Sequence, residues 1–407
     1  MPKVIVAKRR DSREFISLVE SLGYEIAGIV EFREGKNPKY YLSRGKVEEI
    51  KKNLETLDNV NLVAIDGVLK SSQWYNLEKE LKVEVRDRVG LIIDIFADRA
   101  RSREAMLQVE YARLQYEIPM IREIIHHTRM GEHAGWHGAG EYEVADYYER
   151  IRRKMTRIKK RLEKIKRERE ERRKHRREAG FVLVGIAGYT NSGKSTLLNA
   201  LTSTGQITEE RMFSTLATKT SRLEKERILI TDTVGFVEDM PPWLIKAFEA
   251  TLEEIYSADV VLLVLDGSDP VEEFRRKMNV TLDIILEKTQ GKIIPVINKI
   301  DAATEIEEKR KIVEELGEPV CISARKGLGL DKLVERIMDE AGMRVHELLV
   351  EDINSWVMDY IRKFGRIIEI KGEGKIKVKF AMLDTLYKEL LRKLDTPLEK
   401  MHLQTRI

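Results

Sequence analysis

Short apolar runs and longer amphipathic stretches alternate along the first hundred residues. They follow one another in this order: 4–7 (strand-like), 12–22 (helix-like), 25–30 (strand-like), 47–57 (helix-like), 62–65 (strand-like), 73–81 (helix-like) and 83–85 (strand-like). Such alternation is typical of an α/β domain, in which helices cover the faces of a sheet. We therefore expect a small α/β domain over residues 1–103.

Two seams of apolar side chains follow, over residues 104–179. Their members recur at spacings of three and four: Leu107, Tyr111, Leu114, Ile118, Ile121 and Ile125 in the first seam, and Val144, Tyr148, Ile151, Met155, Ile158, Leu162 and Ile165 in the second. Glycines between residues 131 and 140 separate the seams. This pattern predicts an antiparallel coiled-coil hairpin. Pro119 lies inside the first seam, and we expect it to kink or break that helix.

The end of the chain has a different pattern, which predicts a small α+β domain over residues 346–407. Helix-like stretches at 352–364 and 383–394 flank an alternating run over 367–380. This run turns at Gly372-Glu-Gly374, and alternation about glycine is typical of a β-hairpin.

Length and composition exclude some classes of protein. A chain of 407 residues, 42% of them hydrophobic, is long enough for several domains with their own cores. The lone Cys321 excludes an internal disulfide and is typical of a cytosolic protein. No N-terminal signal-like segment is visible, and the longest apolar run, 260–265, is too short to cross a bilayer. We expect a cytoplasmic protein.

Positive charge is concentrated in the second helix of the predicted hairpin. Between Arg150 and Glu178 there are 17 Lys/Arg against 5 Asp/Glu, a net +12, whereas the whole chain is only +4. Such a face favours contact with the phosphate backbone of a nucleic acid, with strong salt dependence and no DNA sequence specificity. The alternative is an ordinary solvated helix face.

A run that begins at Gly188 fits the phosphate-binding loop G-x-x-x-x-G-K-[ST] at every position. It comprises Gly188, Tyr189, Thr190, Asn191, Ser192, Gly193, Lys194 and Ser195, and Thr196 follows. A strand-like run at 181–186 precedes it, and a helix-like run at 195–201 follows. In such loops backbone N–H groups wrap a phosphate, the lysine reaches the β- and γ-phosphates, and the hydroxyl ligates Mg²⁺. We expect Lys194 and Ser195 to take these two roles.

A second segment ends a short apolar run at 228–231. It consists of Asp232, Thr233, Val234 and Gly235. We expect the Asp232 carboxylate to hold the Mg²⁺ shell and the Gly235 N–H to meet the γ-phosphate. The following residue, Phe236, stands where many GTPases have a glutamine that orients the attacking water. Because phenylalanine cannot hydrogen-bond water, we expect slow intrinsic turnover; a simple packing role for Phe236 is compatible with this.

Two further segments identify the base as guanine. Asn298, Lys299 and Asp301 follow a strand-like run, and a carboxylate such as Asp301 can accept hydrogen bonds from guanine N1–H and the 2-amino group. Adenine offers no such donor pair. The other segment contains Ser323, Ala324 and Arg325, where we expect the Ala324 N–H to meet guanine O6. All four segments in this order predict a GTPase domain over residues 180–345, with GTP or GDP as ligand.

A hydroxyl-rich loop lies between the phosphate-binding helix and Asp232. In GTPases such a loop becomes ordered when a threonine hydroxyl ligates Mg²⁺ beside the γ-phosphate. Thr215, Thr218 and Thr220 are all candidates on chemical grounds, and most hydroxyls there would otherwise only form turns.

Segments outside these motifs resemble the HflX family of GTPases. The resemblance rests on runs 87–100 and 103–110, on Gly138-Ala-Gly-Glu141 and on the residues around Asp232-Thr-Val-Gly-Phe236, and it covers residues 40 to about 330. It implies an N-terminal α/β domain, a helical hairpin, a Ras-like domain, and binding to the large (50S) ribosomal subunit and its rRNA, with hydrolysis linked to release or splitting. It also implies that a loop with Thr215 as Mg²⁺ ligand contacts the nucleotide. The residues of that loop are Phe213, Ser214, Thr215, Leu216 and Ala217.

The chain departs from the family near the hairpin tip and in the first domain. Members have a glycine where Ser43 stands and an arginine-containing run where this chain has Trp136 and His137. RNA contacts at the tip are therefore not carried over. The histidines near the tip are His126, His127, His133 and His137. We interpret them as loop or RNA-facing residues rather than a metal site, since the glycines among them disfavour a rigid helix.

The expected fold class is therefore α/β, with a Ras-like P-loop GTPase domain after the α/β domain and hairpin and before the α+β domain. The expected function is a GTP-hydrolysing switch on the large ribosomal subunit, monomeric when free. Lys194, Thr215 and Gly235 are the expected catalytic residues, and Ser195, Thr215 and Asp232 the metal ligands. The alternative is a nucleotide-gated scaffold on RNA or a membrane surface, in which turnover is incidental.

Overall fold

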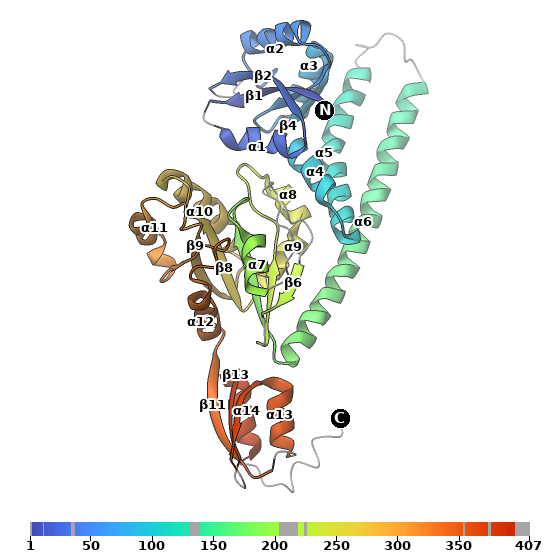
Figure 1. Cartoon of the computed structure of the whole chain (residues 1–407). Helices are drawn as coiled ribbons and strands as arrows, with labels where there is room; N and C mark the ends of the chain where they lie inside the picture. The colour runs from blue at the N-terminus through green and yellow to red at the C-terminus, as the bar shows by residue number, and fades with distance from the viewer. Residues whose placement is uncertain are drawn as a thin grey trace. The chain divides into compact units, whose positions relative to one another are not determined.

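Two units make up the chain in the computed structural model, and Figure 1 labels most of its helices and strands. The structure describes residues 2–10, 12–33, 37–129, 139–202, 219–223, 226–352, 355–372 and 376–394. The first unit contains the described residues up to Arg167 together with Val237–Ala250, and the second contains the others. The chain therefore passes from the second unit into the first between Phe236 and Val237.

A parallel four-stranded sheet with the order β2-β1-β3-β4 is the centre of the first unit. Its elements are β1 (Lys3–Arg9), α1 (Arg13–Ser21), β2 (Glu25–Phe32), α2 (Arg44–Thr56), β3 (Val60–Ile65), α3 (Ser71–Leu81), β4 (Glu84–Asp87) and α4 (Arg88–Arg99). Helices α2 and α3 cover one face, and α1 and α4 cover the other (Figure 1). Each of the predicted strand-like and helix-like segments overlaps an element of the expected type.

The hydrophobic pattern does not predict helix α4. Its residues are buried almost all round, including the run from Val89 to Ile93, so the pattern has no polar face to mark the helical period. The helix begins at Asp87, whose side chain accepts a hydrogen bond from the Gly90 N–H at 2.8 Å. This cap satisfies one of the free N–H groups of the first turn.

Helices α5 (Arg103–Arg129) and α6 (Ala139–Glu178) pair along their apolar seams. The buried members of this cluster are Leu107, Leu114, Ile151 and Ile158. Lys154 forms an ion pair with Glu110 at 2.5 Å, whereas Arg122, further along α5, contacts the earlier Tyr148 ring. The two helices therefore run antiparallel.

Pro119 does not break α5. The helix is continuous from Arg103 to Arg129 with Pro119 inside it, so the expected break is wrong. A proline removes one backbone hydrogen bond. The neighbouring Ile118 and Ile121 pack against the seam cluster, and this burial offsets the loss.

A six-stranded mixed sheet is the centre of the second unit, with the order β10-β9-β8-β5-β7-β6. Its elements are β5 (Val182–Gly188), α7 (Lys194–Thr202), β6 (Lys219–Arg222), β7 (Ile228–Asp232), α9 (Glu249–Tyr256), β8 (Val260–Asp266), α10 (Val271–Ile285), β9 (Lys292–Asn298), α11 (Ile306–Val313), β10 (Val320–Cys321) and α12 (Leu330–Glu340). Only β6 is antiparallel to its neighbour. Since the other strands are parallel, the segments that follow β5, β7 and β9 emerge at the same edge of the sheet. The short helix α8 (Pro242–Ala247) belongs to the first unit.

The last part of the second unit is an antiparallel sheet with the order β11-β13-β12. Its elements are β11 (Met343–Val350), α13 (Trp356–Phe364), β12 (Arg366–Lys371), β13 (Ile376–Leu383) and α14 (Asp384–Leu394). Met358 and Ile361 of α13 pack with Phe380 and Leu390 in its core. The hydrophobic pattern does not predict β11, because charged and apolar residues alternate irregularly along it. No helix within the described ranges is long and apolar enough to cross a membrane.

Candidate functional site

The loop between β5 and α7 contains the glycine-rich run 188–195. Gly193 has a φ of 92°, and a Cβ atom at this position would lie 2.3 Å from Nδ2 of Asn298. Only glycine therefore fits there without strain. The Ser192 hydroxyl is buried and has no hydrogen-bond partner within the part of the chain that the structure describes. A glycine loop that leads into a helix N-terminus, with a buried donor to satisfy, is suited to an anion.

Lys194, the first residue of α7, is buried beneath this loop. Its Nζ donates a hydrogen bond to the backbone carbonyl of Tyr189 at 2.7 Å. Burial lowers the pKa of Lys194 to about 8, although the Asp232 carboxylate acts in the opposite direction. A phosphate beside this ammonium group would favour its charged form. The positive charge of Lys194 is therefore only partly balanced by negative groups of the protein.

Ser195 and Asp232 meet beside Lys194. The Ser195 hydroxyl donates a hydrogen bond to Oδ2 of Asp232 at 2.6 Å, and Asp232 is the buried last residue of β7. A hydroxyl and a carboxylate are hard oxygen donors, which Mg²⁺ prefers. The described residues contain no cluster of three or more His, Cys, Asp or Glu that could hold a metal. A metal here would thus rely on this pair together with the phosphates of a ligand.

The backbone after β7 pairs with the phosphate loop. The Phe236 N–H donates to the Gly188 carbonyl at 3.2 Å, and the Thr190 N–H donates to the Phe236 carbonyl at 2.8 Å. A Cβ atom on Gly235 would lie 2.8 Å from Nζ of Lys194 and 3.0 Å from Cα of Thr190, so only glycine allows this approach. The Phe236 side chain is buried and has the packing role that the sequence left open.

Asn298 joins the phosphate loop to the loop after β10. Its Nδ2 donates to the Ser192 carbonyl at 2.9 Å, and its Oδ1 accepts from the Ala324 N–H at 3.0 Å. The Ala324 N–H is thus engaged by Asn298, so a contact with guanine O6 would require it to be shared between two acceptors. Lys299 forms an ion pair with Asp266 at 2.6 Å, which fixes the backbone at the end of β9.

Asp301 follows β9 and lies next to the loop of Ser323 and Arg325. The Ser323 hydroxyl and, at 3.4 Å, the Lys326 ammonium group hold the pKa of Asp301 below its usual value. The carboxylate is therefore ionised at neutral pH and can accept two hydrogen bonds from a base edge. Its position beside Asn298 and the phosphate loop would place such a base at the edge of the sheet.

Several predicted site residues have other contacts or lie outside the described residues. The Thr233 hydroxyl donates to the Ile186 carbonyl at 2.8 Å and so supports the sheet. Thr220 lies on β6, where its hydroxyl is 2.9 Å from that of Thr231. The predicted residues that lie outside the described ranges are Phe213, Ser214, Thr215, Leu216, Ala217, Thr218, His133 and His137. The stacked pair His127 and Tyr75, with ring centres 4.2 Å apart, lies on α5 and α3.

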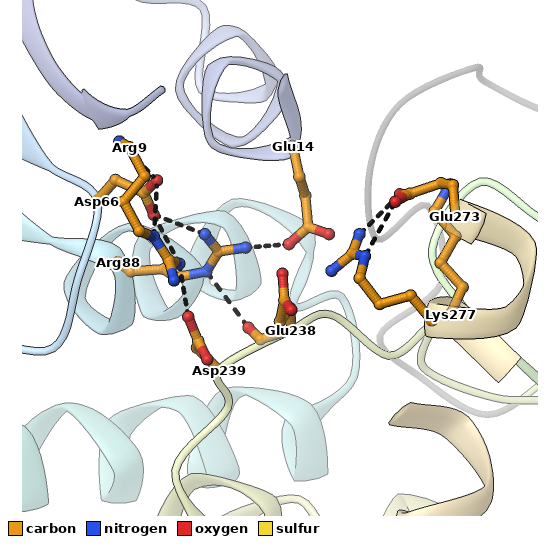
Figure 2. Close-up of polar contacts among 9 residues, drawn as sticks. Arg9, Glu14, Asp66, Arg88, Glu238, Asp239, Glu273 and Lys277 are labelled. Carbon is orange, nitrogen blue, oxygen red and sulfur yellow. Dashed lines mark hydrogen bonds and ion pairs between the residues drawn. The ribbon is translucent and has the colours of Figure 1, made fainter. Parts of the chain in front are cut away.

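Sequence reasoning missed a buried arginine that holds the segment after Phe236. Arg88 is fully buried, and Figure 2 shows its guanidinium directed at Glu14, Asp66 and the backbone of Glu238. It donates to Oδ1 of Asp66 at 2.7 Å and to the Glu238 carbonyl at 3.3 Å, and it pairs with Glu14. All these residues belong to the first unit.

A second arginine extends this cluster. Arg9 contacts Asp66 at 3.3 Å and Asp239 at 2.6 Å (Figure 2). Burial would raise the pKa of Asp66, but Arg9 and Arg88 together lower it, so the carboxylate stays ionised. The edge-to-face contact of Phe96 and Phe248, with ring centres 4.6 Å apart, adds an apolar anchor. Residues 237–250 are therefore fixed to the first unit, although they directly follow the nucleotide motif.

Family models match most of the chain. They are described as GTP-binding GTPase N-terminal (residues 9–97), GTP-binding GTPase Middle Region (residues 99–176) and 50S ribosome-binding GTPase (residues 183–299). The first covers the α/β domain from the end of β1, the second covers the paired helices, and the third begins in β5 and ends at the Asn298-Lys299 motif.

Curated relatives are similar over nearly the whole chain. The GTPase HflX of Thermococcus kodakarensis is 40% identical over 387 residues, which are 93% of this chain and 85% of the relative. The GTPase HflX of Methanocaldococcus jannaschii is 40% identical over 368 residues, 89% of this chain and 90% of the relative. Among solved structures, the crystal structure of SsGBP in complex with GDP covers 84% of this chain and 98% of its own, at 28% identity and a TM-score of 0.52.

Proposed function

The chain belongs to the HflX family of GTPases, and on this premise we propose that it is a GTP-driven switch acting on the large ribosomal subunit. It binds GTP and hydrolyses it to GDP and phosphate. The observation that carries the proposal is the meeting of four motif segments at one sheet edge, in a domain that matches the 50S ribosome-binding GTPases. The switch would serve translation, ribosome splitting or rescue, or ribosome biogenesis.

Each motif has a distinct part in holding the nucleotide. The backbone N–H groups of residues 188–195 and the Lys194 ammonium group would bind the phosphates. Asp301 would accept the N1–H and 2-amino hydrogens of guanine. The Ala324 N–H would be shared between Asn298 and O6. Residues 213–217 would contact the nucleotide, with Lys194, Thr215 and Gly235 acting on the γ-phosphate.

Mg²⁺ would be held by Ser195 and Asp232, with Thr215 as a further ligand. The Ser195–Asp232 distance of 2.6 Å means that the metal would replace their direct hydrogen bond. When bound, Mg²⁺ neutralises charge on the β- and γ-phosphates. Phe236 offers no group that can orient the attacking water, so we expect slow turnover until a partner supplies one.

The switch would act through the backbone between Gly235 and Asp239. A γ-phosphate that contacts the Gly235 N–H would act on the residue next to Phe236, whose backbone pairs with Gly188 and Thr190. The same backbone continues directly into Glu238 and Asp239, which the arginines of the first unit hold. The state of the nucleotide would thus be coupled to the α/β domain and the paired helices along the chain itself.

The partner surface would be the basic face of α6. Residues such as Lys159, Lys160 and Arg161 are exposed, and between Arg150 and Glu178 the helix has a net +12. A face of this kind suits the phosphate backbone of rRNA. We further propose four domains, over residues 1–103, 104–179, 180–345 and 346–407, and a cytoplasmic location, where ribosomes are found.

Co-sedimentation tests the proposal. The full chain is centrifuged with purified large ribosomal subunits in the presence of either GDP or a non-hydrolysable GTP analogue. We expect the protein to sediment with the subunits when the GTP analogue is present and to remain mostly in the supernatant when GDP is present. Equal association in both states, or none in either, would contradict a nucleotide-driven switch on this partner.

A further inference from the structure

A cavity of about 320 Å³ opens in the first unit between the α/β sheet and the paired helices. Its walls come from α3, β4, α4, α5 and α6, and none of its lining residues belongs to the nucleotide motifs. Ligand sites measure about 300–1,000 Å³. This cavity is therefore at the small end of the range, and it suits a single ring system rather than a peptide or a whole cofactor.

Two aromatic side chains in its wall are held rigidly. Trp74 donates its indole N–H to the Val85 carbonyl at 3.2 Å. The Tyr116 hydroxyl donates to Oδ1 of the buried Asp87 at 2.8 Å. Because both polar groups are satisfied inside the protein, the rings are fixed in place. A third aromatic residue, Tyr147, is 48% exposed. Aromatic walls of this kind favour a planar ligand.

The charged groups of the cavity cancel one another. Asp94 lies between Arg86 at 3.3 Å and Arg113 at 2.8 Å. Glu117 is partly buried, and no hydrogen bond or ion pair joins its carboxylate to any other described residue. Burial raises the pKa of Glu117, while Arg113 opposes this shift. Two cations and two carboxylates thus line a space that is neutral overall and has one acceptor group available.

We propose that this cavity binds a guanine-like base, a flat neutral ring with two adjacent N–H donors on one edge and acceptors on another. The Glu117 carboxylate would accept hydrogen bonds from N1–H and the 2-amino group. The guanidinium of Arg113 uses one N–H on Asp94 and has further donors for O6 or N7. Trp74 and Tyr116 would flank the ring.

Other ligand classes fit the cavity less well. A phosphate would lie against the carboxylates of Asp94 and Glu117, and an organic cation would lie against Arg86 and Arg113. Adenine has no adjacent pair of N–H donors for Glu117, so it would leave this partly buried carboxylate without a second hydrogen bond.

Such a base can be part of a free guanine nucleoside or nucleotide, or an unpaired guanosine in RNA. Proteins recognise single-stranded RNA by stacking unpaired bases on aromatic side chains and bonding their edges. The RNA source rests on the proposed function, because it requires an RNA partner. The base-binding chemistry of the cavity does not.

Binding of small ligands to the full chain tests the proposal. The protein is loaded with one equivalent of GDP and Mg²⁺, and excess nucleotide is removed, so that the nucleotide domain is filled. Guanosine, adenosine and the RNA trimers ApGpA and ApApA are then titrated and followed by saturation-transfer NMR of the base protons. We expect guanine-containing ligands to bind about tenfold more tightly than their adenine counterparts, as for a bidentate base contact.

A matched pair of variants assigns the site. Glu117→Gln removes the carboxylate at nearly constant size, and we expect it to abolish the preference for guanine. Glu110 lies on the same helix as Glu117 but pairs with Lys154. We therefore expect Glu110→Gln to bind guanine-containing ligands as the natural chain does. Circular dichroism and GTP hydrolysis without a partner should be equal in both variants, which separates loss of binding from misfolding.

The outcomes distinguish the sources and can overturn the proposal. Binding of both guanosine and ApGpA supports a site for free bases, and binding of ApGpA alone supports an RNA source. The proposal would be overturned if neither guanosine nor ApGpA bound, or if guanosine and adenosine bound with equal affinity. It would also be overturned if Glu117→Gln bound the guanine-containing ligands as tightly as the natural chain does. Guanosine binding together with failure to associate with ribosomal subunits would refute the proposed function alone.

Discussion

At the scale of single residues, two charges set the chemistry of the nucleotide site. Lys194 is buried with its pKa lowered to about 8, and Asp301 is kept ionised by Ser323 and Lys326. The first is suited to a phosphate because it lacks full compensation within the protein. The second is suited to a base edge with two N–H donors. Lys194 therefore favours a ligand with a phosphate, and Asp301 favours a ligand with a guanine-like base.

Replacing Asp301 by asparagine should change which base is preferred. Two hydrogen bonds to a charged acceptor are each worth about 1.5–3 kcal/mol, so we expect GTP affinity to fall roughly a hundredfold or more. Xanthine carries an oxygen where guanine has its 2-amino group, and the asparagine amide can donate to it. Competition between GTP and XTP measures the change. Asp331→Asn on α12 is the control and should keep the natural preference for GTP. If Asp301→Asn also kept this preference, the role of Asp301 in base recognition would be refuted.

GTP affinity should decrease as the pH rises through 8. Below pH 8 Lys194 is already protonated in the free protein, whereas above it the phosphates must recruit a proton on binding. We expect affinity to fall roughly tenfold between pH 7 and pH 9. In Lys194→Ala affinity should be lower by about a hundredfold and flat over the same window. Titrations of both proteins with a fluorescent GTP analogue test this, and a similar slope in Lys194→Ala would contradict it.

At the scale of elements, the segment after β7 has contacts in two directions. Phe236 pairs with the phosphate loop, while Glu238 and Asp239 are held by Arg88 and Arg9. The buried arginine cluster is thus a structural anchor for the part of the chain that follows the nucleotide motif.

Removing Arg88 should destabilise the first unit strongly. Arg88→Ala leaves the buried Asp66 with Arg9 alone and removes the ion pair of Arg88 with the partly buried Glu14, and breaking buried pairs costs about 3–5 kcal/mol. Arg44→Ala is a suitable control, since Arg44 pairs with Glu48 on the surface and should matter by less than about 1 kcal/mol. Urea unfolding followed by circular dichroism measures both. A loss below about 1 kcal/mol in Arg88→Ala would contradict the anchoring role.

Local signals explain what could be predicted from the sequence. Helix α2 has one buried face and is marked by its period, and β1 is marked by a short run of apolar residues. In contrast, α4 is buried nearly all round, and β11 alternates irregularly. The phosphate loop and the Asn298-Lys299 motif are short runs whose chemistry is readable in order. The Arg9–Asp239 pair joins residues 230 positions apart, and no local sequence pattern near either residue predicts it.

At the scale of the whole molecule, charge and nucleotide chemistry lie on different parts of the chain. The basic residues are concentrated on α6, and the phosphate and base motifs follow β5, β7 and β9. A basic helix gives affinity for RNA with little base specificity. The nucleotide state would then control when α6 binds RNA.

Reversing charge on α6 should weaken association with large subunits and reduce its salt dependence. The triple variant Lys159→Glu, Lys160→Glu, Arg161→Glu removes three exposed cations. We expect the slope of log affinity against log salt to fall by about 2–3. A control triple changes Lys288, Lys292 and Lys332 to Glu in the second unit. Binding at several salt concentrations tests this, and equal slopes in both variants would rule out α6 as the contact.

We propose a GTPase that the large ribosomal subunit activates. The most direct test measures GTP hydrolysis by the full chain with and without purified large subunits, at two salt concentrations. We predict at least a tenfold stimulation that fades at high salt, since catalytic groups supplied by partners are worth about 10³–10⁵ in other GTPases. Co-sedimentation without stimulation would contradict the switch and favour a scaffold, and the absence of both would point to a different partner.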